Sequence, residues 1–531
     1  MPRVHALGLL KSALKAVTPK PVRVKARTLL ARAKMAGAGL LTKGARASEL
    51  LLLDGRDPDE VFLSRSTGGA LSHKDLRSLN QLAVTALNDV DIAGSIRNAL
   101  PGALLSGNDD DVEKLEIKEQ ACFYLAIALI QGLGRLDEAV FWWRTRRRAA
   151  AAIVRHRLAK HGVVPDPRNL IFDQFWSAYL GHTAMLGIHA KKNILSGNSR
   201  HLMLVRPPPG HKGNPCLLDH WRKYFELVDD ASKLDVPADC VWLHSKFLFV
   251  DECLTGADTY FWQVYAEVSR EWEKAGRGAL LQLSPPEIER GQAALAAMGV
   301  PRGAWYACLH VRSPGFKLSH ESLQFTLNAD IATYDLAIDA IVQRGGWVIR
   351  IGDPSMPKLP ARHGVVDYAH SPRKADWMDV FLFATCRFYV GTSSGPAYAP
   401  NLFGTPSVAT NWFPTGTRPL NSSDIFLPKL HVYKRMGEPA PFAESLAPPL
   451  GHIHAMPTLD SLGVSIRDNS PDELRDAVVE MLERLEGTAA YTAEDDRLQA
   501  RFDSVATNAR SFGNARIGRD FIRKYRSLLP C

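Results

Sequence analysis

The chain has 531 residues, of which 46% are hydrophobic and 23% are charged, and it carries a formal net charge of +9 at pH 7. This length exceeds what one hydrophobic core usually holds, and this composition excludes a largely disordered chain, so we expect two or more globular domains. Residues 1–48 hold eleven Lys and Arg and no acidic residue, which leaves the remaining chain at about −2. The basicity belongs to one short arm and predicts no nucleic-acid partner.

The seven cysteines stand at scattered positions and form neither a disulfide framework nor a CxxC metal-binding pattern, which indicates a reducing compartment. No apolar run reaches the roughly 18 to 20 residues that cross a bilayer, and the start lacks a signal-peptide pattern, so we expect a cytoplasmic protein. The basic arm at residues 1–48 leaves three interpretations open. It is a plain tail, an arm that holds the protein peripherally on anionic lipid at the inner membrane, or an organelle transit peptide.

Residues 49–160 show helical periodicity. The segment from Ala121 to Ala139 resembles one tetratricopeptide hairpin, with a turn at Gly134 and Ala139 opening the second helix. A single repeat cannot bury its own apolar face, so this hairpin would need helical neighbours. The arginine-rich run at residues 144–148 predicts a solvated helix face, with contact to an acidic membrane as the alternative.

Between residues 161 and 300, short apolar runs alternate with polar turns, which predicts an α/β layer. The predicted strands cover residues 170–172, 201–205, 240–243 and 247–250. The first of them leads to Gly181-His182-Thr183 and then to a helix-like segment. This strand-to-helix edge could face a similar edge further along the chain.

Three apolar runs between residues 301 and 490 end in polar clusters. The clusters are His310-Val-Arg312, Gly352-Asp353 and Gly391-Thr392-Ser393-Ser394-Gly395-Pro396, the last followed by residues 397–403 with helical character. In open parallel sheets ligands bind outside the carboxyl ends of the strands, and a helix N-terminus beside an arginine fork suits a phosphate. The pattern therefore predicts a phosphate site.

Two helices carry start signals. Ser284 with Glu287 and Ser470 with Glu473 each predict a capping box followed by proline at the first helical position. The second helix should bury one face, made by Leu474, Val478, Met481, Leu482 and Leu485. The last segment, residues 491–531, predicts a helical tail.

Five segments together resemble a bacterial glycosyltransferase family over about residues 161–430. They are His310-Val-Arg312, Gly345-Gly-Trp-Val-Ile-Arg-Ile-Gly-Asp353, Val366-Asp-Tyr-Ala-His-Ser371, Asp376-Trp-Met-Asp-Val-Phe-Leu382 and Cys386-Arg-Phe-Tyr-Val-Gly-Thr-Ser-Ser-Gly-Pro396. The loop after the last strand is similar to the donor loop of lipopolysaccharide heptosyltransferases. However, Tyr398 replaces a histidine and Ser393 an aspartate of that pattern, so the heptose donor does not carry over. The first segment is similar to that of fucosyltransferases, where the arginine binds the sugar-nucleotide diphosphate, although their longer arginine-rich motif is absent.

The resemblance implies an α/β fold with two Rossmann-like domains, the GT-B architecture, preceded by an α-helical, tetratricopeptide-like N-terminal region. The expected parts are a basic arm (1–48), a helical region (49–160), an N-terminal acceptor domain (161–300), a C-terminal nucleotide-sugar domain (301–490) and a helical tail (491–531).

The resemblance also implies the site. The expected donor-binding residues are His310, Arg312, Arg350, Asp353, Asp367, Thr392, Ser393, Ser394, Gly395 and Pro396, and the expected catalytic residues are Arg312 and the acceptor base His182. Structural alternatives stay open for each. Arg312 could pair with Asp330 or Asp353, Arg350 could be a buried partner of Asp367 or Asp353, the histidines could be structural, and the loop could be a plain turn.

No acidic cluster ends an apolar strand, since Asp89, Asp91 and residues 109–111 lie in the helical region. We therefore expect no metal and no cofactor: arginine and a helix N-terminus would stabilise the leaving diphosphate. The expected function is a metal-independent glycosyltransferase in polysaccharide biosynthesis that moves a sugar from a nucleotide-sugar donor to a glycan, lipid-linked or protein acceptor. The alternatives are a sugar-nucleotide 2-epimerase or hydrolase of the same architecture, or a non-catalytic tetratricopeptide-type adaptor.

Overall fold

A computed structural model describes residues 112–530, except 198–199, 208–212, 231–232, 235, 238–239, 242–249, 257 and 315–324. The chain divides into two compact units, Met1–Val163 and Val164–Cys531. The basic arm, the acidic clusters and most of the predicted helical region lie outside the described residues.

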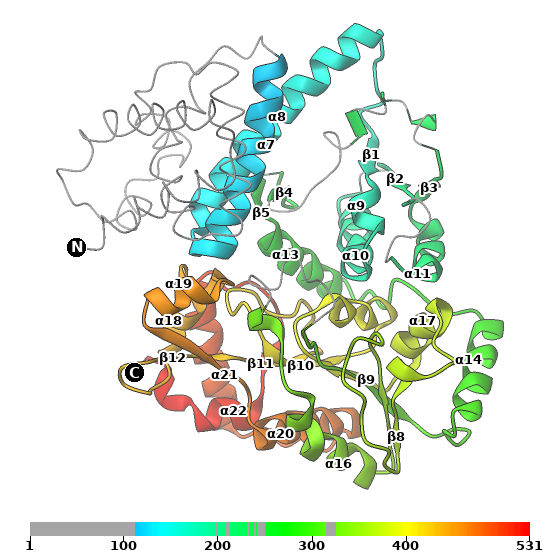
Figure 1. The fold of residues 1–531 in the computed structure, drawn as a ribbon, viewed down its shortest axis with the longest axis vertical. Coiled ribbons are helices and arrows are strands. Elements are labelled where there is room, and N and C mark those ends of the chain that lie inside the picture. The colour runs from blue at the N-terminus through cyan, green and yellow to red at the C-terminus, as the bar shows by residue number, and fades with distance from the viewer. Residues whose placement is uncertain are drawn as a thin grey trace, which may run out of the picture. The chain divides into compact units, whose positions relative to one another are not determined.

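The first unit contains a helical hairpin (Figure 1). Helix α7 (Val112–Ile127) continues into a π-helical turn, η2 (Ala128–Gly132), and α8 (Leu136–His161) returns along it. The chain reverses at Gly134, whose φ of +64° is readily adopted only by glycine. A helical hairpin with its turn at Gly134 is therefore present in this part of residues 49–160, and its second helix begins at Leu136, before the predicted Ala139.

The predicted solvated face of α8 is wrong at Arg146. Its side chain is only 4% exposed, and its Nε lies 2.6 Å from Oε1 of Glu119 on α7, itself 5% exposed. The guanidinium also lies 4.7 Å from the ring of Trp143. Arg146 faces the partner helix, whereas Arg148 and Arg155 remain exposed.

The second unit begins with a small parallel sheet, in the order β1 (Asn169–Phe172), β2 (His201–Val205), β3 (Glu226–Val228). The first two strands confirm the predictions. The elements around this sheet are α9 (Gln174–Ser177), α10 (Leu180–Leu195), α11 (Pro215–His220), the antiparallel pair β4 (Val250–Glu252) and β5 (Asp258–Tyr260), and α13 (Phe261–Lys274). The predicted strand at residues 240–243 is wrong at its two described residues, Cys240 and Val241, which are helical.

A seven-stranded sheet forms the core of the rest, and all its strand pairs are parallel. Its strands are β6 (Tyr306–His310), β7 (Trp347–Arg350), β8 (Val365–Val366), β9 (Phe388–Gly391), β10 (Ser407–Trp412), β11 (Ile425–Pro428) and β14 (Arg516–Ile517). The helices beside it are α14 (Pro285–Ala297), α16 (Asp335–Gln343), α17 (Asp376–Thr385), α20 (Pro471–Glu486), α21 (Ala493–Asn508) and α22 (Arg519–Lys524). Every residue of β6, β9, β10 and β11 is buried, as expected for strands covered on both faces. The expected mixed α/β class with a large parallel sheet is confirmed.

The strand order, β14-β11-β10-β9-β6-β7-β8, contains one reversal. From β6 the chain moves outward to β7 and β8, then returns to the other side of β6 and moves outward again through β9, β10 and β11. The switch point of the sheet therefore lies between the carboxyl ends of β6 and β9, where open parallel sheets bind their ligands.

Both predicted capping boxes are present: the N–H of Ser284 donates to Glu287 at 2.7 Å, and that of Ser470 to Glu473 at 2.9 Å. Leu485, however, is 39% exposed, because it lies in the last turn of α20. The segment 491–531 is not wholly helical, since β14 extends the large sheet beside β11 and buries Ile517 there.

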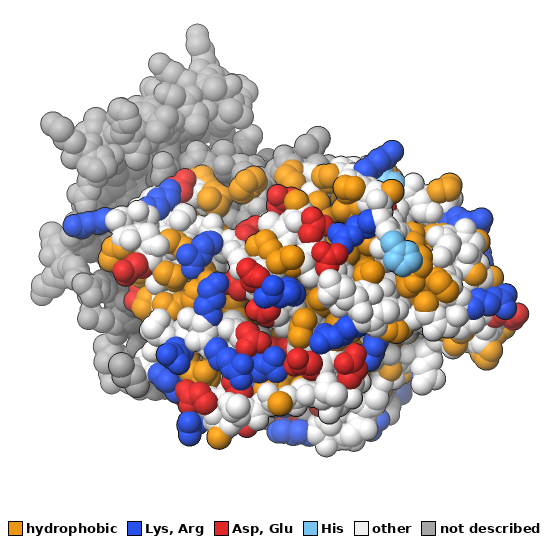
Figure 2. All heavy atoms as spheres, turned by 90° about the horizontal axis from the view of Figure 1, so that it is seen from below, with side chains coloured by type: hydrophobic (Ala, Val, Ile, Leu, Met, Phe, Trp, Pro, Cys, Tyr) orange, Lys and Arg blue, Asp and Glu red, His pale blue; other side chains and the backbone are white. Residues whose placement is uncertain are grey.

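On the face of the molecule that Figure 2 shows, Lys and Arg side chains alternate with Asp and Glu, so no single charge sign dominates it. None of the helices in the described ranges is both long and apolar enough to cross a bilayer.

Candidate functional site

Hydrogen bonds join the carboxyl ends of β6 and β9. The backbone N–H of Arg312 donates to the hydroxyl of Thr392 at 3.0 Å, and the N–H of Thr392 donates to the carbonyl of His310 at 3.1 Å. Gly391 allows this approach, because a Cβ there would lie 2.6 Å from the same carbonyl. The fold thus brings two of the predicted clusters together at the switch point.

His310 lies beneath this loop and is 5% exposed. Its Nδ1 is 3.1 Å from the hydroxyl of Ser394. Burial, with the nearby Arg350 cation, lowers the pKa of His310 to about 4, so the ring is neutral near pH 7. His310 therefore supports the loop as a hydrogen-bond partner and not as a cation.

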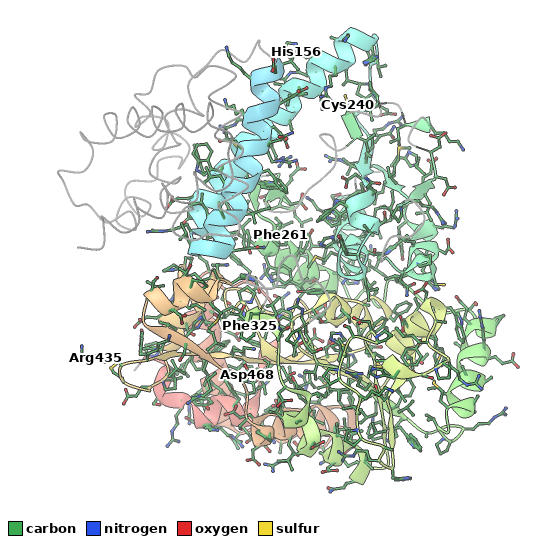
Figure 3. The ribbon with its side chains drawn as sticks, viewed as in Figure 1. His156, Cys240, Phe261, Phe325, Arg435 and Asp468 are labelled. Atoms are coloured by element: carbon green, nitrogen blue, oxygen red, sulfur yellow. The ribbon has the colours of Figure 1, made fainter. Side chains whose placement is uncertain are left out.

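Arg312 is oriented by residues that the sequence analysis did not identify. Its Nη1 donates to Oδ1 of Asn328 at 3.0 Å. The carbonyl of Asn328 accepts from the ammonium of Lys429 at 2.6 Å, and that ammonium pairs with Asp468, labelled in Figure 3, at 2.8 Å. Lys429 is 3% exposed inside an apolar run, which is a sequence signal for a buried, partnered cation.

The segment after the β9 loop differs from the prediction. Residues 397–403 do not form one helix but belong to two short 3₁₀ turns, η10 (Gly395–Tyr398) and η11 (Pro400–Phe403). Pro400 has no N–H and cannot continue an α-helical ladder. Among the described residues, this edge of the sheet therefore carries Arg312 and a short loop and no extended helix dipole.

A β-bulge in β10 lies beside the same loop. The register shifts between Ala409 and Trp412, and Asn411 adopts a left-handed φ of +47°. Its backbone N–H and side-chain carbonyl exchange hydrogen bonds with Asn469 at 2.6 and 2.7 Å. The N–H of Phe413 then donates to the hydroxyl of Ser393 at 2.8 Å. Bulges and held left-handed residues of this kind are frequent next to binding sites.

Three other predicted donor residues bond among themselves or to the backbone. Arg350 is 1% exposed and its Nη1 lies 2.9 Å from Oδ1 of Asp367, so the structure gives it the ion-pair alternative. The other oxygen of Asp367 accepts from the N–H of Leu359 at 3.0 Å. Asp353 accepts from the N–H of Ser355 at 2.8 Å.

The predicted strand-to-helix edge at Gly181 does face the loop that follows β9. A Cβ on Gly181, in the first turn of α10, would lie 2.7 Å from Cα of Gly395. The adjacent His182 stacks on Phe175 with ring centroids 4.2 Å apart, and its Nδ1 lies 3.2 Å from the carbonyl of Phe175. A carbonyl can only accept, so a neutral ring that makes this bond carries its proton on Nδ1.

Within the described ranges, no three His, Cys, Asp or Glu side chains gather in a way that could hold a metal ion.

Ser394, Gly395 and Pro396 are half-buried, whereas Thr392 and Ser393 are buried.

Comparisons with known proteins give distant structural similarities. No family model and no curated protein matches the chain. It is similar to a glycosyl transferase of family 9 from Veillonella parvula DSM 2008, with 11% identity, a TM-score of 0.31, and coverage of 50% of this chain and 87% of that one. It is also similar to TibC from enterotoxigenic E. coli H10407, described as a bacterial iron-containing dodecameric glycosyltransferase, with 14% identity, a TM-score of 0.28, and coverage of 46% of this chain and 59% of that one. A structure of TibC as a heptosyltransferase in complex with ADP-D-β-D-heptose gives 14% identity, a TM-score of 0.28, and coverage of 47% and 59%. Such TM-scores carry no functional conclusion, so function is inferred from the site alone.

Proposed function

We propose that the chain is a glycosyltransferase that transfers a sugar from a nucleotide-sugar donor to a glycan, lipid-linked or protein acceptor. The observation that carries this proposal is the position of Arg312 at the switch point of the parallel sheet, bonded through its backbone to the Thr392 loop. A guanidinium there offers a planar fork to the diphosphate, and it stabilises the charge that grows as the anomeric bond breaks.

The acceptor side of the proposed site is the first turn of α10. Gly181 packs against Gly395, which places the neighbouring His182 at the edge of the donor loop. We assign His182 the role of acceptor base through Nε2. The two-sheet arrangement would then be a GT-B architecture, with the donor on the large sheet and the acceptor against the small one. We propose that Arg312 and the half-buried Ser394 supply the diphosphate contacts and that no metal is required.

The test is incubation with a panel of nucleoside-diphosphate sugars, each with and without candidate glycan, lipid-linked and protein acceptors, while released nucleoside diphosphate is measured. A glycosyltransferase releases it much faster with the right acceptor. Release that no acceptor accelerates would indicate the epimerase or hydrolase, and absence of nucleotide binding by calorimetry would indicate the adaptor.

A further inference from the structure

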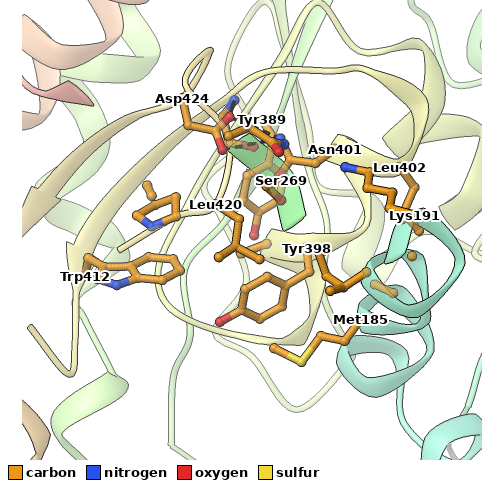
Figure 4. Close-up of a pocket in the computed structure, with 18 residues that line it drawn as sticks. Met185, Lys191, Ser269, Tyr389, Tyr398, Asn401, Leu402, Trp412, Leu420 and Asp424 are labelled. Atoms are coloured by element: carbon orange, nitrogen blue, oxygen red, sulfur yellow. Dashed lines mark hydrogen bonds between the residues drawn. The ribbon is translucent and has the colours of Figure 1, made fainter. Parts of the chain in front are cut away.

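A cavity of about 40 Å³ lies between α10 and α13 on one side and the large sheet on the other (Figure 4). Lys191, Ser269, Ser407 and Asp424 are among its lining residues. Since one water needs about 10–15 Å³ of such volume, the cavity has room for about three waters. Ligand pockets of drug-sized molecules are roughly ten times larger, so the cavity is too small to hold a nucleotide sugar.

Two hydroxyls and one ammonium are among the polar groups of its wall. Lys191 is 9% exposed, and its ammonium lies 5.7 Å from the centroid of the Trp272 ring. The hydroxyls of Ser269 and Ser407 are buried and have no hydrogen-bond partner within the described ranges. Buried polar groups in native proteins are nearly always satisfied, by protein or by ordered water.

The opposite charge in the cavity is the fully buried carboxyl group of Asp424. It accepts from the N–H of Ser407 at 2.8 Å and from the amide of Asn401 at 3.1 Å. Glu273 of α13 interacts electrostatically with both Asp424 and Lys191, and Arg484 of α20 does so with Asp424.

The charges decide what the cavity can hold. An anion would be repelled by Asp424 and Glu273, and a cation by Lys191. Water is neutral and both donates and accepts, so it alone can satisfy the ammonium, the hydroxyls and the carboxylate together. We infer that the cavity holds a small cluster of ordered water molecules that joins Lys191 to Asp424, and that this hydrated contact positions helix α10 on the large sheet.

The contact between Lys191 and Asp424 affects the candidate site through helix α10. The helix carries Lys191 near its end and Gly181 in its first turn, where Gly181 packs on Gly395. Lys191 is therefore a positioning residue for the wall of that site. What this wall does in catalysis rests on the proposed function, but the hydrated contact does not.

The decisive experiment is a double-mutant cycle on the full chain at pH 7.5, where Asp424 has lost its proton, with thermal unfolding and amide hydrogen exchange as readouts. Lys191→Met and Asp424→Asn should each lower Tm and speed exchange in the first turn of α10. The double variant should recover much of both losses, because no buried charge is left unpaired. In the control cycle, Lys192→Met with Asp424→Asn, the Tm losses should add, since the ammonium of Lys192 pairs with Asp251 at 3.1 Å. Additive losses in the Lys191 cycle would overturn the inference.

A crystal structure of the wild-type chain at high resolution tests the water cluster even if the variants fail to fold. Two or more ordered waters in contact with Lys191, Ser269 or Ser407 are expected. A dry cavity, or bromide there after a bromide soak, would overturn the inference. Neither experiment uses a nucleotide sugar, so failure here and failure of the proposed function are distinguishable.

Discussion

Asp424 makes the stability of the protein depend on pH. Burial raises the pKa of this carboxyl group to about 7, although hydrogen bonds from Ser407 and Asn401 lower it. Between about pH 4 and 7 the folded state therefore holds a proton that the unfolded state releases, so the stabilisation is present at low pH and is lost as pH rises towards 7. Lys191, Glu273 and Arg484 face Asp424 and modulate this titration.

The wild-type Tm should accordingly fall from pH 5 to pH 7.5 relative to Asp424→Asn, whose amide cannot titrate. A relative fall of about 2 °C or more is expected, which is the shift that about 1 kcal/mol makes in a large domain. Differential scanning calorimetry of both proteins at each pH measures it. Parallel Tm curves would show that Asp424 is ionised throughout.

Residues at the candidate site were predictable from the sequence where they directly follow an apolar run. Arg312 and Thr392 were identified because each comes just after a strand, and parallel strands end at one edge of the sheet. Asn328, Lys429 and the Lys191–Asp424 pair were not, because their partners are distant in sequence and only the tertiary fold brings them together. Arg146 was misassigned for the same reason, since its partner lies on the other helix of the hairpin.

At the scale of elements, the approach of α10 to the donor loop depends on two glycines. Gly181→Ala would place a Cβ 2.7 Å from Cα of Gly395, which forces the helix and the loop apart. A loss on the order of 10-fold or more in kcat/KM is expected, since misplacing reacting groups by about 1 Å costs about 100-fold. Gly278→Ala is the matched control, because nothing lies within 4 Å of a Cβ there. Equal activity of the two folded variants would argue against catalysis at this contact.

The sequence predicted helices and strands well where the signal lies within the element itself. The capping boxes at Ser284 and Ser470 fixed both helix starts, and the continuous apolar runs fixed β6 and β9. The helix expected after the donor loop does not form, because Pro400 interrupts the backbone hydrogen bonds that it would need. The short strand β14 had no such signal, because two residues show no periodicity and their pairing with β11 is a tertiary event.

At the scale of the molecule, the proposed chemistry assigns the diphosphate to Arg312 and the β9 loop and not to a metal. Turnover should therefore survive dialysis against EDTA within about twofold. The measurement is the rate of nucleoside diphosphate release before and after chelation, with Mg²⁺ and Mn²⁺ added back. Complete loss that only a divalent ion restores would refute metal independence while leaving the donor site open.

The central claim is that Arg312 at the β6–β9 switch point binds the donor diphosphate, and the most direct test compares wild type with Arg312→Lys. Calorimetry would use the nucleoside diphosphate that binds the wild type best. The lysine keeps the charge but loses the planar fork, so Kd should rise, and kcat should fall on the order of 30- to 1000-fold, the cost of about 2 to 4 kcal/mol for one lost preorganised donor. Arg344→Lys, on the exposed end of α16, should behave as wild type. Unchanged binding and turnover in a folded Arg312→Lys protein, or its failure to fold, would contradict the account and make Arg312 a structural residue.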